Sequence, residues 1–124
     1  MTNQQATRMD IAIDDRMGVT VVSVGGSLDS LTADQLLQAL TEQVRAGRTH
    51  LVAACDALEY TSSAGLRVLL ATVREVRQRG GDLRLAAVKD KVRRVLELSG
   101  FTSILKCYPS VDAAVASYPK VSTS

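Results

Sequence analysis

Three consecutive hydroxyl residues, Thr61, Ser62 and Ser63, stand between an apolar run and a segment with helical spacing of leucines. One such hydroxyl is enough to cap a helix, because it accepts a hydrogen bond from a free backbone N–H group of the first turn. Ala64 and Gly65 follow, and Gly costs about 1 kcal/mol of helix propensity relative to Ala. The small residues are expected to leave the hydroxyls open to a partner molecule.

A serine at a helix N-terminus is also a suitable acceptor of a phosphoryl group. The modification adds a charge of about −1.5 to −2. Free N–H groups and the positive end of the helix dipole tolerate that charge, so the domain need not unfold. The charge would act instead on whatever protein binds there. Capping explains much of the same pattern, and from the residues alone both interpretations stay open.

The sequence contains no arrangement that is typical of an enzyme active site. Phosphate-binding GxxxxGK[ST] and GxGxxG runs, HExxH, CxxC and the GxSxG elbow are all missing from it. The single histidine, His50, precedes a strand and has no evident partner for general base catalysis. Cys55 and Cys107 lie in apolar segments and are interpreted as small buried residues. We expect no enzyme activity, no cofactor and no metal site.

Composition places the chain among ordinary globular proteins. Its 124 residues suit one domain, with 46% hydrophobic and 23% charged residues. No apolar run approaches the roughly 20 residues of a membrane span, and the N-terminus has no signal-peptide pattern, so a cytoplasmic location without membrane insertion is expected. A net charge of +2 is too small to suggest nucleic-acid binding.

The charges are unevenly distributed along the chain. Residues 1–60 carry eight acids and four bases, whereas residues 61–94 carry nine bases and three acids. Such an asymmetry can orient a protein partner during encounter. Solvated helix faces are the alternative interpretation.

Strand-like and helix-like segments alternate along the chain. Strands are expected at Met9–Asp14, Val19–Val24, Leu51–Cys55, Asp82–Val88 and Ile104–Tyr108. Helices are expected from Thr32 to Gly47, from the Thr61–Ser63 segment to Gly80, from Asp90 to Gly100, and after the cap Ser110. The order ββαβαβαβα predicts an α/β fold, with a mixed sheet, crossover helices and an N-terminal hairpin. Residues 1–8 are expected to be a disordered lead-in, 9–118 a single domain and 119–124 a flexible tail.

Local signals sharpen the prediction around the first helix. Gly25 and Gly26 are expected to end the second strand, and 26–29 to form a short loop. Thr32 and Gln35 have the spacing of a capping box. The residues expected to form the apolar stripe of this helix are Leu36, Leu37, Leu40 and Val44.

Three patches of the chain resemble the STAS domain, and specifically the bacterial anti-sigma factor antagonists. Residues 62–70 resemble the family's D-S-[ST]-G-L-G-V-L-L stretch, and 26–29 with 32–33 resemble its G-E-L-D…T-A stretch. Residues 92–96 with 99–101 resemble its later helix and S-G-[LF] turn. The likeness covers Met9 to Ser117 and implies the STAS-type fold.

The resemblance also implies a function. In the family, the unphosphorylated antagonist binds an anti-sigma factor that is also an ATP-dependent serine kinase, and this frees the sigma factor. The kinase ends the binding by phosphorylating one serine of the antagonist, and a metal-dependent serine phosphatase restores it. The acceptor lies two residues before the motif glycine, which makes it Ser63 here. Asp29 matches an acid of the family's docking loop.

The chain departs from the family pattern at three positions. Ser62 stands where the family has Asp, and Ser27 where it has Glu, so two acidic groups are missing. Arg67 replaces a glycine one helical turn after Ser63, where it could pair with a phosphate or simply be solvated. The predicted partner-binding residues are Ser27, Asp29, Thr61, Ser62, Ala64, Gly65 and Arg67.

Two other functions remain as alternatives. STAS domains also serve as subunits of membrane transport complexes, including lipid-transport ATPases, where the same surface would be a constitutive docking module. Some resemble nucleotide-binding sensors, which the lack of a phosphate loop in this sequence disfavours.

Overall fold

An antiparallel hairpin begins the part of the chain that the computed structural model describes, residues 9–119. Strand β1 (Asp10–Arg16) pairs with β2 (Val19–Leu28) through a two-residue turn of Met17 and Gly18. Both turn residues have positive φ, 55° and 84°, as the twist of a tight hairpin requires. The predicted lead-in, 1–8, and residues 120–124 of the predicted tail lie outside the described residues.

Helices and strands alternate after the hairpin. They are α1 (Ala33–Arg45), β3 (His50–Thr61), α2 (Ser63–Gln78), β4 (Asp82–Ala86), α3 (Asp90–Leu98), the 3-10 turn η2 (Phe101–Ser103), β5 (Cys107–Tyr108) and α4 (Val111–Ala116). The strands lie side by side in the order β1-β2-β3-β4-β5, and all neighbours after the hairpin are parallel. The predicted ββαβαβαβα order and mixed sheet are confirmed.

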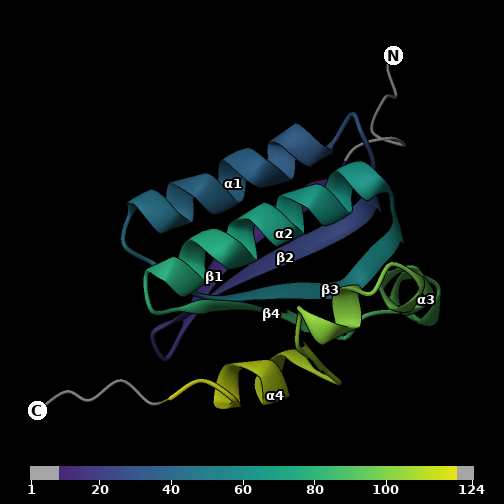
Figure 1. Cartoon of the computed structure of the whole chain (residues 1–124). Helices are drawn as coiled ribbons and strands as arrows, with labels where there is room; N and C mark the ends of the chain where they lie inside the picture. Colours follow the sequence, from purple (N-terminus) through teal and green to yellow (C-terminus); the bar gives the residue numbers. More distant parts are fainter. Residues whose placement is uncertain (1–8, 120–124) are drawn as a thin grey trace, which may run out of the picture.

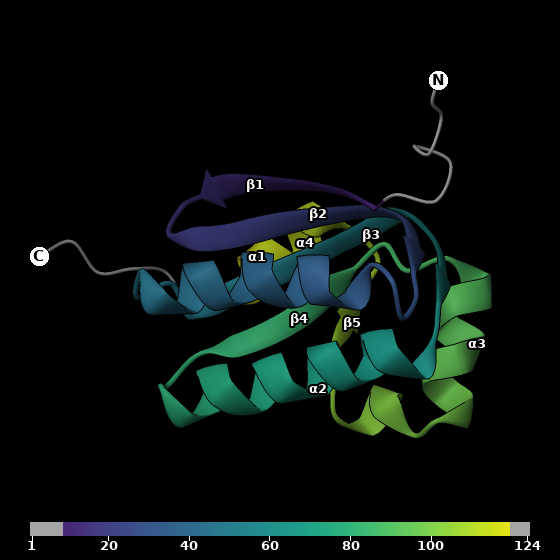
Figure 2. The same ribbon diagram turned by 90° about the horizontal axis from the view of Figure 1, so that it is seen from above.

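The sheet separates two apolar layers. Helices α1 and α2 cover one face and α4 covers the other, while α3 lies at the end of the sheet where α2 begins (Figures 1 and 2). Leucine and valine side chains fill the larger layer, under α1 and α2, as expected for a chain with one Phe and no Trp. The smaller layer consists of Val19, Val21, Val52, Ala54, Ala86, Ala114 and Tyr118. Parallel strands covered in this way are expected to be apolar on both faces, and β3 is so from Leu51 to Cys55.

Gly25 and Gly26 do not end β2, contrary to the prediction. The strand continues to Leu28, and its pairing with β3 slips between Ser23 and Gly25 and again after Gly26. Gly26 has a φ of +100°, and a Cβ on Gly25 would lie 3.2 Å from the Cβ of Ala57. The glycines therefore mark irregular pairing within a strand, and the predicted loop at 26–29 is wrong except at its last residue.

Other predicted boundaries were also wrong. Strand β3 continues six residues beyond Cys55. This part contains exposed polar residues, so a continuous apolar run does not predict it. Strand β4 stops at Ala86 because Ala87 turns the chain with a φ of +56°. Strand β5 has two residues instead of the five predicted. Leu37 is 39% exposed and does not belong to the buried stripe of α1.

The predicted capping box of α1 does not form. Thr32 is the N-cap residue, but its Oγ1 donates to the carbonyl oxygen of Ser27 at 2.7 Å. Gln35 uses its Nε2 to donate to the carbonyl oxygen of Met9 at 2.9 Å, which ties α1 to the start of the hairpin. The cap predicted at Ser110 is confirmed, since its Oγ accepts from the backbone N–H of Ala113 at 3.0 Å.

A buried carboxylate holds the end of the sheet where the parallel strands begin. Asp82 accepts hydrogen bonds from Arg77 Nε at 2.8 Å, from Arg84 Nε at 3.0 Å and from the backbone N–H of Leu83 at 2.9 Å. Burial opposes its ionisation, but the two arginines outweigh burial and hold the pKa of Asp82 below its ordinary value.

Tyr118 completes this cluster from the other face of the sheet. Its hydroxyl lies 2.6 Å from the carbonyl oxygen of Leu51 and 2.7 Å from that of Asp82, and Arg84 lies 4.1 Å above its ring. Burial raises the pKa of the Tyr118 phenol, so it remains a donor. We call Arg77, Asp82, Arg84 and Tyr118 the base cluster.

Candidate functional site

The start of α2 lies beside the end of β2. Leu28 and Thr61 are register partners at the last position of the two parallel strands. The backbone N–H of Ser62 donates to the carbonyl oxygen of Leu28 at 2.8 Å. This hydrogen bond brings the loop that starts at Asp29 next to the first turn of α2. We call residues 61–65 the α2 tip.

No side chain among residues 9–119 caps helix α2. Ser62 is the N-cap residue, with an extended backbone, yet its Oγ is buried and has no hydrogen-bond partner among the described residues. Thr61 is buried and donates its hydroxyl to the carbonyl oxygen of Ser62 at 3.3 Å. Ser63 alone of the three is exposed. The first-turn N–H groups therefore lack a side-chain acceptor, and the accessible hydroxyl is that of Ser63.

Gly65 is required by packing inside the domain. It is buried, and a Cβ at this position would lie 2.3 Å from Leu28 Cγ and 2.8 Å from Thr61 Oγ1. The group that approaches this glycine closely is thus Leu28, from within the domain. Ala64 is half-buried against the core. The helix start is pressed against the end of β2, which positions Ser63 outward.

The loop after β2 is held by its own polar groups. Asp29 Oδ1 accepts from the backbone N–H of Leu31 at 2.9 Å and from that of Thr32 at 3.1 Å. Thr32 Oγ1 accepts in turn from the backbone N–H of Asp29 at 2.9 Å. Asp29 thus fixes the loop shape, a role that its position in the sequence did not reveal. Ser27 contributes a carbonyl oxygen to the same loop.

Apolar side chains flank the site and were missed by the sequence analysis. Leu31, in the loop after β2, is 82% exposed, and Tyr60, directly before the tip, is 51% exposed. The sequence signal that could have revealed Leu31 as a contact residue is an apolar side chain inside a short polar loop. Arg67 is exposed four residues after Ser63, on the same side of α2, and it belongs to none of the ion pairs found within residues 9–119.

The arrangement is suited to binding. Burial raises the pKa of the Cys55 thiol to about 12 and also raises that of Cys107, which keeps both thiols protonated and weakly nucleophilic. His50 stacks on Tyr118 at 4.9 Å, at the end of the sheet away from the tip. Residues 9–119 contain no group of three His, Cys, Asp or Glu that could hold a metal ion. None of the helices in that range has the length and apolar character needed to cross a membrane.

The comparisons with known proteins agree with the fold. The STAS domain model matches residues 10–114. The chain is 38% identical over 110 residues to BtrV of Bordetella bronchiseptica, whose name describes an anti-sigma factor antagonist, and the match covers 89% of this chain and 95% of BtrV. The crystal structure of an anti-sigma factor antagonist from Mycobacterium paratuberculosis superposes with a TM-score of 0.80 at 32% identity, covering 87% of this chain and 92% of that one.

The fold is also that of the Bacillus cell fate determinant SpoIIAA in its phosphorylated form, with a TM-score of 0.69 at 18% identity over 86% of this chain and 97% of that one. The strand order, the helix start beside the end of β2 and the two relatives above 30% identity lead to one assignment. The chain belongs to the STAS domain family, in its group of anti-sigma factor antagonists.

Proposed function

We propose that this protein is a phosphorylation-switched binding protein that acts in the cytoplasm. In its unmodified form the α2 tip binds an anti-sigma factor that is also an ATP-dependent serine kinase, and the sigma factor is released. Phosphorylation of Ser63 ends the binding, and a metal-dependent serine phosphatase restores it. The protein supplies the surface and the acceptor hydroxyl, and no catalytic group. The observation that carries the proposal is the exposed Ser63 at the uncapped start of α2.

The α2 tip can accept a phosphoryl group without loss of the fold. Its first-turn N–H groups have no side-chain acceptor, and no acidic residue lies in the first turn of α2. A phosphate on Ser63 would meet free donors and the positive end of the helix dipole. The packing of Gly65 on Leu28 lies behind the hydroxyl and would be undisturbed. The consequence of modification would therefore fall on the partner.

A bound partner would respond strongly to the modification. An interface that closes over a neutral hydroxyl would have to bury a dianion, and burying an uncompensated charge costs several kcal/mol. Asp29, held beside the tip, adds a negative charge to the same surface. Ser27, Ser62, Ala64 and Arg67 complete the proposed partner surface around it.

The modification site is tested by phosphorylation in vitro. Incubation of the full chain with its anti-sigma factor kinase and ATP should add one phosphoryl group, measured by intact mass. Ser63→Ala should abolish the addition, whereas Ser62→Ala, the matched neighbour with a buried hydroxyl, should retain it. A phosphoryl group found on another residue with Ser63 unmodified would refute the assignment.

The switch is tested by binding. Ser63→Asp should weaken binding of the kinase at least about tenfold, as expected when a charge is placed in a desolvated interface. Equal affinity of Ser63→Asp and Ser63→Ala would exclude a switch based on charge. Recovery of a transport ATPase subunit and no kinase, in a pull-down from the native cell, would favour a constitutive docking module instead.

A further inference from the structure

Helix α3 carries an exposed row of side chains beside the α2 tip. We propose that this row, Lys91, Arg94 and Leu98, extends the partner surface, and that it meets an acidic region of the anti-sigma factor around an apolar pocket. The inference rests on the proposed function, because it takes the anti-sigma factor as the partner. It adds a second contact region and its chemistry.

Contacts within the domain place α3 next to the tip. Lys89, the N-cap residue of α3, forms an ion pair with Glu59, two residues before Thr61 in β3. The start of α2 and the whole of α3 lie at the same end of the molecule in two perpendicular views (Figures 1 and 2). A partner that covers Ser63 would therefore also reach α3.

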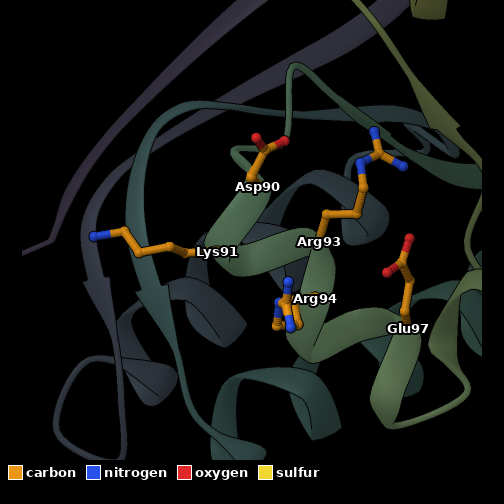
Figure 3. Close-up of a pocket in the computed structure, with 5 residues that line it drawn as sticks. All are labelled: Asp90, Lys91, Arg93, Arg94 and Glu97. Atoms are coloured by element: carbon orange, nitrogen blue, oxygen red, sulfur yellow. The ribbon is translucent and has the colours of Figure 1, made fainter.

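The charged residues of α3 form two rows along the helix. Asp90, Arg93 and Glu97 form the first row, in which one base stands between two acids. Burial raises the pKa of the Cys107 thiol, Arg93 lowers it and Glu97 raises it. Lys91 and Arg94 belong to the second row, and Arg94 also has Asp90 four residues before it and Glu97 three residues after it. Figure 3 shows Lys91 pointing away from Arg93 and Glu97. A hollow of about 460 Å³ is lined by side chains of both rows.

Lys91, in the second row, acts on a carboxylate of β3. The hydrogen bond and charge of Lys89 and, more weakly, the charge of Lys91 lower the pKa of Glu59 in β3. Neither Lys91 nor Arg94 takes part in the ion pairs found within residues 9–119. Arg67 of the α2 start is likewise outside these ion pairs. Three cations that form no ion pair within residues 9–119 thus occur on α3 and the first turns of α2.

An apolar side chain ends the same row. Leu98 is 82% exposed, seven residues after Lys91 and four after Arg94, which places it on their side of α3. An exposed leucine beside unpaired cations matches a partner with acids around an apolar pocket: the charges accelerate encounter and the leucine slows dissociation.

The test measures association and dissociation rates with the purified anti-sigma factor kinase that binds the unmodified full chain. The double variant Lys91→Glu/Arg94→Glu should lower the association rate at low salt about tenfold or more. The matched control Arg45→Glu/Arg48→Glu makes the same change in net charge at the far end of α1, and it should lower the rate less than about threefold. Leu98→Ser should raise the dissociation rate about tenfold, while Met17→Ser, an exposed apolar residue in the hairpin turn, should not change it.

The outcomes separate this inference from the proposed function. If Ser63→Asp loses binding while the α3 variants behave like their controls, the proposed function stands and the α3 surface is refuted. If the α3 variants leave kinase binding unchanged but alter self-association in sedimentation experiments, the surface binds a second copy of the chain and the proposal is wrong. If the unmodified chain fails to bind any anti-sigma factor, both fall. Equal melting midpoints of all variants confirm that the fold is retained.

Discussion

The two ends of helix α2 treat their polar groups in opposite ways. At its C-terminal end, Arg77 donates to the buried Asp82, and that carboxylate is held by a second arginine and a backbone N–H group as well. At its N-terminal end, the Ser62 hydroxyl is buried without a partner among the described residues, and Ser63 is exposed. At the C-terminal end the polar groups are hydrogen-bonded within the domain. At the N-terminal end the first-turn N–H groups have no side-chain acceptor among the described residues.

The difference indicates a division between stability and binding along one helix. Buried polar groups that are fully hydrogen-bonded specify and stabilise a structure, whereas unsatisfied ones are uncommon and call for an explanation. The base cluster should therefore control the free energy of unfolding and leave partner binding unchanged. Polar changes at the α2 tip should have the reverse effects.

The largest expected effect on stability is at the base cluster. Asp82→Asn leaves Arg84, whose side chain is 13% exposed, without its anionic partner, and should lower the free energy of unfolding by about 3 kcal/mol. Urea denaturation followed by circular dichroism measures it. Glu75→Gln is the control, because the pair of Glu75 with Arg79 is exposed and should contribute less than about 0.5 kcal/mol. If Asp82→Asn lowered the free energy of unfolding no more than Glu75→Gln does, the base cluster would not control the stability of the domain.

The same carboxylate predicts a dependence of stability on pH. The pKa of Asp82 is lower in the folded chain than in the unfolded one, so its contribution is fully present above the ordinary value of 3.8. The contribution is lost as pH falls through the lower, folded value. The stability difference between wild type and Asp82→Asn should therefore shrink between about pH 5 and pH 2. Denaturation curves at several pH values test this, and a constant difference would contradict it.

Gly65 lies in the α2 tip, but a substitution there should affect the free energy of unfolding, as substitutions in the base cluster do. Gly65→Ala would ordinarily stabilise a helix by about 1 kcal/mol. Here the added Cβ would meet Leu28, so the variant should instead lose about 2 kcal/mol in thermal or urea unfolding. Ala64→Gly, at the adjacent half-buried position, should lose about 1 kcal/mol from helix propensity alone. If Gly65→Ala were instead more stable than wild type, Leu28 at the end of β2 would be able to move away from the added Cβ without cost.

The sequence predicted the order of the elements because each has a local signal. Apolar spacing marks the helices, and glycines with positive φ end three of them, at Gly47, Gly80 and Gly100. Gly25 and Gly26 gave the same signal inside a strand, where their role is irregular pairing with β3. A single sequence does not distinguish the two roles, since both need a residue that lacks a side chain.

The parts of the site that could not be predicted depend on contacts between distant residues. The packing partner of Gly65 is Leu28, which comes from another strand. The base cluster joins Asp82 to Tyr118 across 36 residues of chain. Neither pair leaves a local pattern. The hydroxyl segment itself was visible because Ser and Thr at a helix start have a local function, although Ser62 does not perform it here.

The smallest expected effect tests whether the α2 tip is uncapped in solution. Ser62→Ala removes a buried hydroxyl that has no partner among the described residues, so the free energy of unfolding should stay the same or rise by up to about 1 kcal/mol. Ser110→Ala is the matched control, because it removes the oxygen that accepts from Ala113 and should cost about 1 kcal/mol. Equal losses in the two variants would mean that Ser62 caps α2 as Ser110 caps α4. The two ends of α2 would then both be satisfied within the domain, and a phosphate on Ser63 would have to compete with the Ser62 hydroxyl for the N–H groups of the first turn.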